Sequence, residues 1–324
     1  MALSALFNSL LRPLGVVLAK RATVDHLADE VRRLEAERAR LAALPPPAAP
    51  VSELPAFERA LEQKLAAMKT ELLQHQISTK WDTIDYLERR RAPSVHERTC
   101  ALCGHQAASA DFKTHTTQCI FEGGVLIRHQ CPACDVIFGA DKMMELTATE
   151  LSRDYEWHYR LYTEGDSTEQ EIRAFHALQP RKDGVYLNYG AGAWSKTIAK
   201  LRADGWNIYA YEPTGSVAEG QQHAITSRAQ LETMHFDGLF SNNVLEHLRY
   251  PFEEMRFMAS RLKPGALMSH ATPCFEYRYE YTRFHLFFFL GRSRQLLADR
   301  SGLAIVDYVT DGDFMNALYR PLPA

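Results

Sequence analysis

The residues whose types and spacing most clearly indicate a chemical role are two pairs of cysteines. Each pair has two residues between its members. The four thiols are Cys100, Cys103, Cys131 and Cys134. Two such turns let four thiolates converge as a tetrahedron, the geometry of a closed structural zinc site. A redox dithiol and an iron–sulfur cluster are the alternatives, but they usually have a single pair or a different spacing. The pattern therefore predicts structural Zn²⁺, with no open position for a substrate.

The segment between the two pairs favours a zinc ribbon. Residues 120–121 and 124–127 are predicted to form strands around a turn at 122–123. His105 or His115 could replace a ligand, but four cysteines are already available. We expect the remaining thiols, Cys119 and Cys274, to be ordinary half-buried side chains.

A second group of residues lies after an apolar strand predicted over 185–189. The strand runs into Gly190-Ala191-Gly192, and a helical pattern follows. Such a turn lets the backbone approach a ligand closely, beside a helix N-terminus. Twenty residues past Gly192, a second strand ends in Glu212, whose carboxylate can accept both ribose hydroxyls of a nucleoside. Together these features predict a nucleoside-containing cofactor.

The next segments carry a family resemblance. A strand over 236–241 is followed by Val-Leu-Glu-His-Leu at 244–248, a helix from Pro251, and Leu-Lys-Pro-Gly-Ala-Leu at 262–267. This run resembles the class I S-adenosylmethionine-dependent methyltransferases over about residues 183–310. With the four cysteines, the chain is similar to the zinc-ribbon methyltransferases of bacterial sugar and polysaccharide biosynthesis. The resemblance implies an α/β, Rossmann-like domain with a mostly parallel, seven-stranded sheet.

The resemblance also implies the site residues. Gly190 and Gly192 are expected under the methionine part of S-adenosyl-L-methionine, Glu212 at the ribose, and Ser227 or its neighbours at the adenine. The full set of expected cofactor contacts is Asn188, Gly190, Ala191, Gly192, Glu212, Ser241, Asn242 and Asn243. The chain departs from the family at Asn188, where an acid is usual, and at Trp194, where a third glycine is usual. A catalytically silent relative therefore stays an alternative.

Two histidines are the candidate catalytic residues. His247 follows the fourth predicted strand and can act as a general base on a hydroxyl, or it packs beside the helix from Pro251. His285, with Arg283, is expected to contact the acceptor. The alternating tyrosines at 277–281 fit either an acceptor-binding loop or a strand with one aromatic face. We expect O-methylation of a sugar or related small polar acceptor, with C-methylation or a cofactor-binding scaffold as alternatives.

The elements that position these sites form the rest of the chain. We expect amphipathic and coiled-coil helices over 1–44, a Pro-rich linker over 45–56, a helical segment over 57–98, the zinc ribbon over 99–146, and the methyltransferase domain over 147–324. The apolar stripe from Val24 to Leu41 repeats about every seven residues, which suits a helix that pairs along one seam. The N-terminal helices either join copies of the chain or support the domain.

Charge and hydropathy limit the partners. A net charge of −3 argues against nucleic acid, because phosphate binding favours a basic surface. No segment has the roughly 18 uninterrupted apolar residues of a membrane span. Residues 1–21 are apolar and basic, so they either lie on an anionic inner membrane surface or pack on a neighbouring helix. We expect a cytoplasmic protein, with this segment as its candidate peripheral membrane contact.

Overall fold

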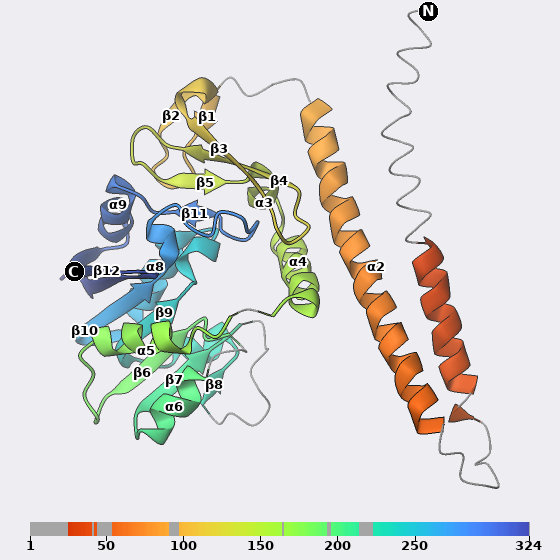
Figure 1. Ribbon diagram of the computed structural model, residues 1–324. Coiled ribbons are helices and arrows are strands. Elements are labelled where there is room, and N and C mark those ends of the chain that lie inside the picture. Colours follow the sequence, from red (N-terminus) through yellow and green to blue (C-terminus); the bar gives the residue numbers. More distant parts are fainter. Residues whose placement is uncertain are drawn as a thin grey trace, which may run out of the picture. The chain divides into compact units, whose positions relative to one another are not determined.

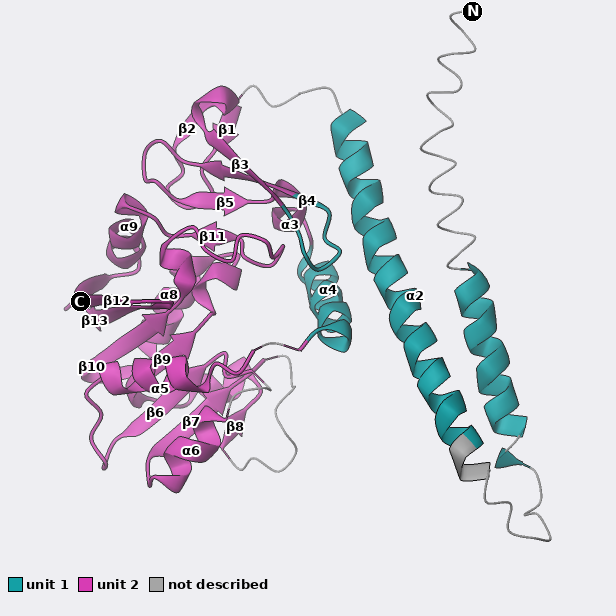
Figure 2. Cartoon of the chain, in the orientation of Figure 1, with its two compact units in different colours: residues 1–92, 118–125, 147–162 teal, residues 93–117, 126–146, 163–324 magenta. Residues whose placement is uncertain are grey.

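The computed structural model describes most of the chain as two compact units. The described residues are 25–40, 42–43, 54–90, 97–163, 165–192, 196–213 and 223–323. Unit 1 comprises residues 1–92, 118–125 and 147–162, and unit 2 comprises 93–117, 126–146 and 163–324 (Figure 2). The predicted membrane contact at 1–21, most of the predicted linker and Trp194 lie outside the described residues.

Unit 1 contains a pair of helices formed by residues 25–40 and α2 (Leu54–Arg90). The apolar stripe predicted from its spacing is buried: Val31 and Leu34 form a core cluster with Leu65 of α2. An exposed ion pair, Glu35–Lys69 at 2.7 Å, lies beside this contact. The seam of the first helix is therefore covered, over the described residues, by the chain's own second helix.

The second half of α2 packs on α4 (Ala148–Leu161). Trp81 is completely buried, and the Lys80 ammonium lies 3.0 Å from the buried Asp154 carboxylate. Thr147 caps α4, because its side chain accepts the Glu150 N–H while the Glu150 carboxylate accepts the Thr147 N–H. This reciprocal cap satisfies donors that a helix start otherwise leaves without partners.

Unit 2 is built on a seven-stranded sheet in the order β12-β13-β10-β9-β6-β7-β8 (Figure 1). The strands are β6 (Val185–Tyr189), β7 (Asn207–Tyr211), β8 (Ala224–Ile225), β9 (Phe236–Asn242), β10 (Leu262–Ala271), β12 (Leu303–Asp311) and β13 (Phe314–Pro321). The five strands from β10 to β8 are parallel, and β13 is antiparallel to both of its neighbours. This confirms the predicted α/β, Rossmann-like fold with a mostly parallel, seven-stranded sheet.

Burial explains which strands are central. The sequence Val-Tyr-Leu-Asn-Tyr of β6 is buried at four of its five residues, as expected for a strand covered on both faces, whereas the edge strand β12 is mostly exposed. Phe175 of α5 (Thr168–Ala177) packs on Tyr186 and Phe240. The other helices that follow along the chain in unit 2 are α6 (Thr197–Ala203), α7 (Arg228–Glu232), α8 (Pro251–Ser260) and α9 (Arg292–Arg300).

The cysteine region contributes a second, smaller sheet to unit 2. Its order is β11-β5-β4-β3, and a separate two-stranded sheet pairs β1 with β2. The strands are β1 (Glu97–Thr99), β2 (Gln106–Ala108), β3 (Lys113–Gln118), β4 (Val125–Gln130), β5 (Ile137–Gly139) and β11 (Phe287–Phe288), and the short helix α3 (Asp141–Met144) follows β5. Because β11 comes from the C-terminal part of the chain, this sheet is completed by residues far from the cysteines in sequence.

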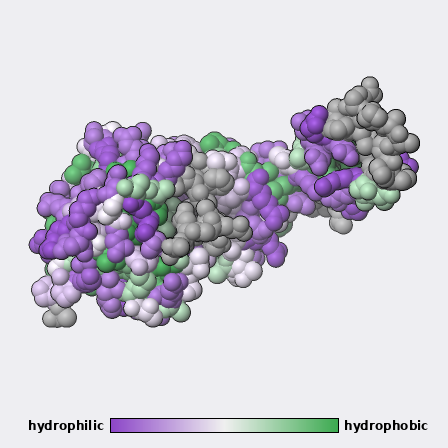
Figure 3. Space-filling view, turned by 90° about the horizontal axis from the view of Figure 1, so that it is seen from below, coloured by the Kyte–Doolittle hydropathy of each residue, from purple (hydrophilic) through white to green (hydrophobic). Residues whose placement is uncertain are grey.

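No described helix is long and apolar enough to cross a membrane. On the face drawn in Figure 3, hydrophilic residues cover most of the described surface, and hydrophobic residues form small separate areas.

Candidate functional site

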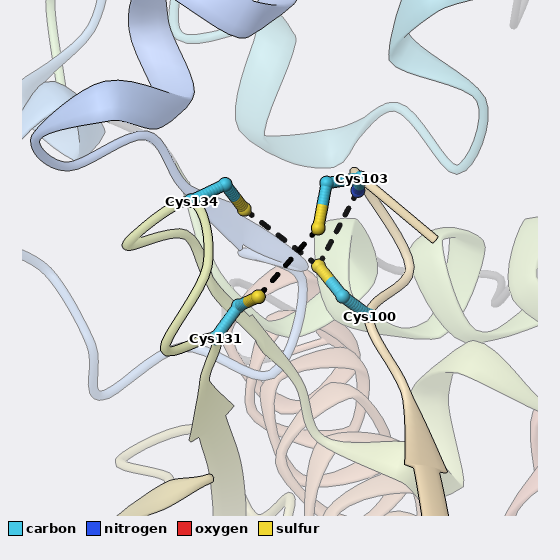
Figure 4. A group of neighbouring side chains, drawn as sticks. All are labelled: Cys100, Cys103, Cys131 and Cys134. Atoms are coloured by element: carbon cyan, nitrogen blue, oxygen red, sulfur yellow. Dashed lines mark hydrogen bonds between the residues drawn. The ribbon is translucent and has the colours of Figure 1, made fainter. Parts of the chain in front are cut away.

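The four predicted ligand cysteines converge in one cluster (Figure 4). The Sγ atoms of Cys100 and Cys134 are 3.8 Å apart, and those of Cys103 and Cys131 are 3.6 Å apart. Zinc–sulfur bonds of about 2.3 Å make a tetrahedron with edges of about 3.8 Å. A disulfide would bring two sulfurs to about 2.0 Å. The residues present therefore fit a tetrahedral metal ion.

Two arginines of α9 fix the loops that carry these cysteines. The Arg300 guanidinium donates to the carbonyls of Leu102 (3.3 Å) and Cys103 (2.9 Å) in the first loop. The Arg292 guanidinium donates to the Pro132 carbonyl in the second loop and to the Asp135 carboxylate, both at 3.0 Å. The two loops that carry the cysteines are thus held by hydrogen bonds from α9 as well as by the hydrogen bonds of their own turns.

The protonation of the cluster shows what a cation would change. Interaction with Cys134 lowers the pKa of Cys100 to about 5, whereas burial raises the pKa of Cys131 to about 11. The sulfurs alone thus favour a thiolate at Cys100 and a neutral thiol at Cys131. A divalent cation among them would favour deprotonation of all four.

The glycine turn lies where β6 ends and is fixed to β7. The N–H groups of Gly190 and Ala191 both donate to the Tyr211 carbonyl, at 2.9 and 3.1 Å. Gly190 and Gly192 have φ values of +71° and +62°, which L side chains rarely adopt. A Cβ on Gly190 would lie 2.6 Å from the Val244 side chain, whereas one on Gly192 would have no atom within 4 Å. Among the described residues, the turn is therefore packed against Val244 at Gly190 and has no close neighbour at the Cβ position of Gly192.

Glu212 is positioned directly at this turn. It follows β7, is 8% exposed, and its Oε2 accepts the Gly192 N–H at 3.0 Å. A carboxylate has about four acceptor positions, of which this bond occupies one. The predicted turn and the predicted acid thus meet in space.

Asn188 has a partner that the local motif does not contain. Its Nδ2 donates to the Glu171 Oε2 of α5 at 2.7 Å, and both side chains are buried. The Asn188 Oδ1 is buried and has no hydrogen-bond partner among the described residues. The Ser167 hydroxyl donates to the other oxygen of Glu171 at 2.5 Å. The family usually has an acid at position 188. Here a carboxylate lies beside that position, but it belongs to Glu171 of α5 and not to a residue of β6.

The residues expected at the end of β9 divide into two groups. Ser241 is fully buried, and its hydroxyl lies 2.5 Å from the Nδ1 of His270 in β10. Asn242 is partly buried, and Asn243 is exposed with a φ of +55°. Asn242 and Asn243 are thus accessible at the carboxyl edge of the sheet, whereas Ser241 contacts its neighbour inside it. Ser227, expected near the adenine, caps α7 by accepting the Gln230 N–H.

The two predicted catalytic histidines contact each other. The rings of His247 and His285 have centroids 4.9 Å apart in an edge-to-face arrangement. Burial lowers the pKa of His247 to about 4, so its imidazole is neutral at pH 7. His247 belongs to the short helix η2 (Leu245–His247) and follows Glu246, which is fully buried. Both histidines lie beyond the carboxyl ends of β9 and β10.

The tyrosine segment is a loop and not a strand. Residues 276–286 contain no strand, which excludes the alternative of an aromatic strand face. The completely buried Arg128 of β4 donates to the carbonyls of Glu280 and Thr282, both at 2.6 Å, and of His285 at 3.3 Å. Nothing in the local sequence marks Arg128, because the carbonyl groups that it binds lie about 150 residues away. This contact fixes the loop that carries His285.

A match to a family model supports the interpretation of the sheet. Residues 159–307, slightly under half of the chain, match the model of a methyltransferase domain. No curated protein matches the sequence. Among solved structures, the chain is similar to the 1,6-didemethyltoxoflavin-N1-methyltransferase of Burkholderia thailandensis, with 15% identity, 65% of this chain and 100% of that chain covered, and a TM-score of 0.46. It is also similar to the CcbJ methyltransferase of Streptomyces caelestis, with 12% identity, 51% and 95% covered, and a TM-score of 0.39.

Proposed function

Because residues 159–307 match the model of a methyltransferase domain, we propose that the chain is an S-adenosylmethionine-dependent enzyme that methylates a hydroxyl of a sugar or related small polar molecule. The observation that carries this proposal is the turn at the end of β6, where Glu212 accepts the Gly192 N–H and a Cβ on Gly192 would meet no atom of the described residues within 4 Å. When bound, the cofactor supplies an electrophilic methyl group on a sulfonium. The residues of the chain must hold it, orient the acceptor and accept one proton.

The proposed cofactor contacts follow the edge of the sheet. Gly190, Ala191 and Gly192 offer a close backbone approach, and Glu212 offers a carboxylate to the ribose. The buried pair of Asn188 and Glu171 offers oxygen acceptors beside the turn, which suits the positively charged end of the cofactor. Asn242 and Asn243 border the same edge. Ser241 acts from inside the sheet, through His270.

The acceptor is proposed to lie beyond β9 and β10. His247 is the proposed general base, because its imidazole follows β9 directly and lies beside the loop that carries His285. That loop also offers Tyr279 and Tyr281, whose rings contact each other at 5.7 Å between centroids. Aromatic faces and hydroxyl groups of this kind suit a sugar, and we infer a role in glycan or polysaccharide biosynthesis from the resemblance of the sequence.

We infer that the four-cysteine cluster holds zinc in a structural role. Four thiolates fill the tetrahedron, so no position remains for a substrate. The proposed ligands are Cys100, Cys103, Cys131 and Cys134, whose sulfur separations match the edge of a zinc–sulfur tetrahedron.

Calorimetric titration of the full chain with S-adenosylmethionine tests the proposal. We expect one binding site, and we expect Glu212→Gln to weaken binding about tenfold to a hundredfold, as for a lost charge-assisted hydrogen bond of about 1.5–3 kcal/mol. If the unmodified chain does not bind S-adenosylmethionine, the proposal that it is a methyltransferase is wrong.

A transfer assay then addresses the acceptor. Labelled cofactor is incubated with sugars, phenols and amines, and release of S-adenosylhomocysteine is measured with each. We expect turnover with a hydroxyl acceptor, and we expect His247→Ala to lower kcat while cofactor affinity is kept. Turnover with a carbon acceptor alone would replace O-methylation by C-methylation.

A further inference from the structure

A second group of ligand-type side chains lies inside unit 2, away from the four cysteines. Atoms of Glu246, Cys274 and His285 that can bind a metal all lie within 4.8 Å of one another. Glu246 and Cys274 are completely buried, and His285 is 9% exposed. The three residues come from different segments: η2 after β9, the short helix η3 (Pro273–Phe275) after β10, and the loop before β11.

Backbone hydrogen bonds hold these three segments together. The Leu286 N–H donates to the Glu246 carbonyl at 2.8 Å, and the Phe289 N–H donates to the Cys274 carbonyl at 2.7 Å. The Arg128 guanidinium also donates a hydrogen bond to the His285 carbonyl, which fixes the loop before β11. The three side chains are therefore brought together by rigid main-chain contacts and not by flexible surface loops.

The side chains around the cluster are arranged as they are around bound metals. The Nδ1 of His285 faces the Cys274 Sγ at 3.3 Å, and the ring also has a hydrogen bond with the backbone of Tyr279. The Thr272 hydroxyl donates to the Glu246 Oε1 at 2.7 Å. Metal-binding histidines and carboxylates typically have a backbone or side-chain partner on their other polar atom. A sulfur and a nitrogen on one tetrahedral zinc ion would be about 3.5 Å apart, close to the observed separation.

We propose that Glu246, Cys274 and His285 bind a divalent cation of the zinc class, whose fourth position takes a hydroxyl or thiol of the methyl acceptor. The carboxylate–thiolate–imidazole set is one that zinc accepts, and three protein ligands leave one tetrahedral position for another atom. The part concerning the acceptor rests on the proposed methyltransferase function, because the cluster lies where the acceptor is expected, beyond β9 and β10. His285 is then a metal ligand, and His247 alone stays the candidate base.

The chemistry of such a site matches the proposed transfer. Coordination to a divalent cation favours the deprotonated form of a hydroxyl or thiol. The acceptor atom gives its proton to the His247 imidazole and forms a bond to the methyl carbon. The carbon–sulfur bond of the sulfonium breaks at the same time, and S-adenosylhomocysteine leaves with that electron pair.

Metal analysis of the full-length protein tests the site. The bound zinc per chain is measured by mass spectrometry in the unmodified protein, Cys274→Ser and His285→Asn, with Cys119→Ser as the control because Cys119 is a buried thiol outside both clusters. We expect Cys274→Ser and His285→Asn each to lose one equivalent, and Cys119→Ser to lose none. Equal zinc in all four proteins would overturn the proposal.

Cobalt substitution supplies a second measurement that does not depend on the folding of a variant. A site with one thiolate and an open position should change its absorption when mercaptoethanol is added to the cobalt-loaded, unmodified protein, and chelation should release two classes of metal. A single class of metal with an unchanged spectrum would overturn the proposal. Calorimetry with S-adenosylmethionine on the same samples keeps the outcomes apart, because loss of cofactor binding would contradict the methyltransferase function and not the metal site.

Discussion

The four-cysteine cluster and the glycine turn are both marked by short motifs, but they differ in what completes them. In the cluster, two Cys-x-x-Cys loops supply all four sulfurs. At the turn, the Gly-Ala-Gly motif supplies only backbone, and the polar groups come from β7 through Glu212 and from α5 through Glu171. A local motif can therefore contain a complete set of candidate metal ligands, whereas the glycine turn marks only the place of the proposed cofactor site.

The largest expected effect tests whether the cluster depends on its four sulfurs. We expect Cys131→Ser to abolish zinc binding there and to unfold the region around β4 and β5, since a structural zinc contributes about 10–16 kcal/mol to small metal domains. Zinc content and thermal unfolding measure this, with Cys119→Ser as the matched control. Full stability in Cys131→Ser without its zinc would mean that the arginines of α9 hold the loops unaided.

The second prediction tests whether the turn depends on a distant carboxylate. Asn188→Asp places two carboxylates where one amide–carboxylate bond of 2.7 Å stands, and buried like charges repel. We expect a loss of S-adenosylmethionine affinity of about tenfold to a hundredfold, or about 1.4–2.7 kcal/mol. Glu171→Gln alone should weaken binding as well.

The double variant supplies the control for that prediction. Asn188→Asp with Glu171→Gln returns one carboxylate and one amide in exchanged positions. We expect it to recover most of the affinity measured by calorimetry. If it binds no better than either single variant, the pair contributes by shape and not by charge.

These predictions also show what the sequence alone could reveal. The strand over 185–189 and the helix start at Pro251 were predicted where they are found, because a buried parallel strand is a continuous apolar run and proline favours a first helical turn. The place of the glycine turn followed from its strand and from Glu212. These signals all lie within a few residues of the feature they mark.

The contacts that the sequence did not predict join residues that only the folded chain brings together. Glu171 lies 17 residues before Asn188 on a helix, and one more acid on an amphipathic helix resembles a solvated side chain. Arg128 binds carbonyl groups, which every residue has. Cys274 was expected to be an ordinary half-buried thiol, but it is completely buried beside Glu246 and His285. No spacing rule joins residues 246, 274 and 285, since their proximity depends on strand order.

A third prediction separates packing from binding within the turn itself. Gly190→Ala places a methyl group 2.6 Å from Val244, whereas Gly192→Ala meets no atom within 4 Å. Both variants carry the cost of a positive φ, about 1–2 kcal/mol. We expect Gly190→Ala to lose further stability through the clash, and Gly192→Ala to keep its stability better but to bind S-adenosylmethionine more weakly. Chemical denaturation and calorimetry on the two variants measure the difference, and equal stability losses would contradict the observed packing.

The smallest expected effect concerns the interior of the sheet beneath both sites. Burial lowers the pKa of His270 to about 3, from an ordinary value of 6.5, and its ring lies between Ser241 of β9 and Tyr319 of β13. Between these pH values the unfolded chain binds the proton and the folded chain does not. Its contribution to stability is therefore complete above pH 6.5 and decreases as the pH falls toward 3. We expect about 1 kcal/mol of this contribution to be lost between pH 6.5 and 5.5, given about 1.4 kcal/mol per pH unit at most.

His270→Asn keeps a polar group near Ser241 but does not titrate, so the free energy of unfolding, measured by denaturation at the two pH values, should depend less on pH in this variant. If the dependence of unfolding free energy on pH is unchanged in His270→Asn, other buried groups cause the acid sensitivity of unit 2. Protonation of His270 then contributes nothing to it.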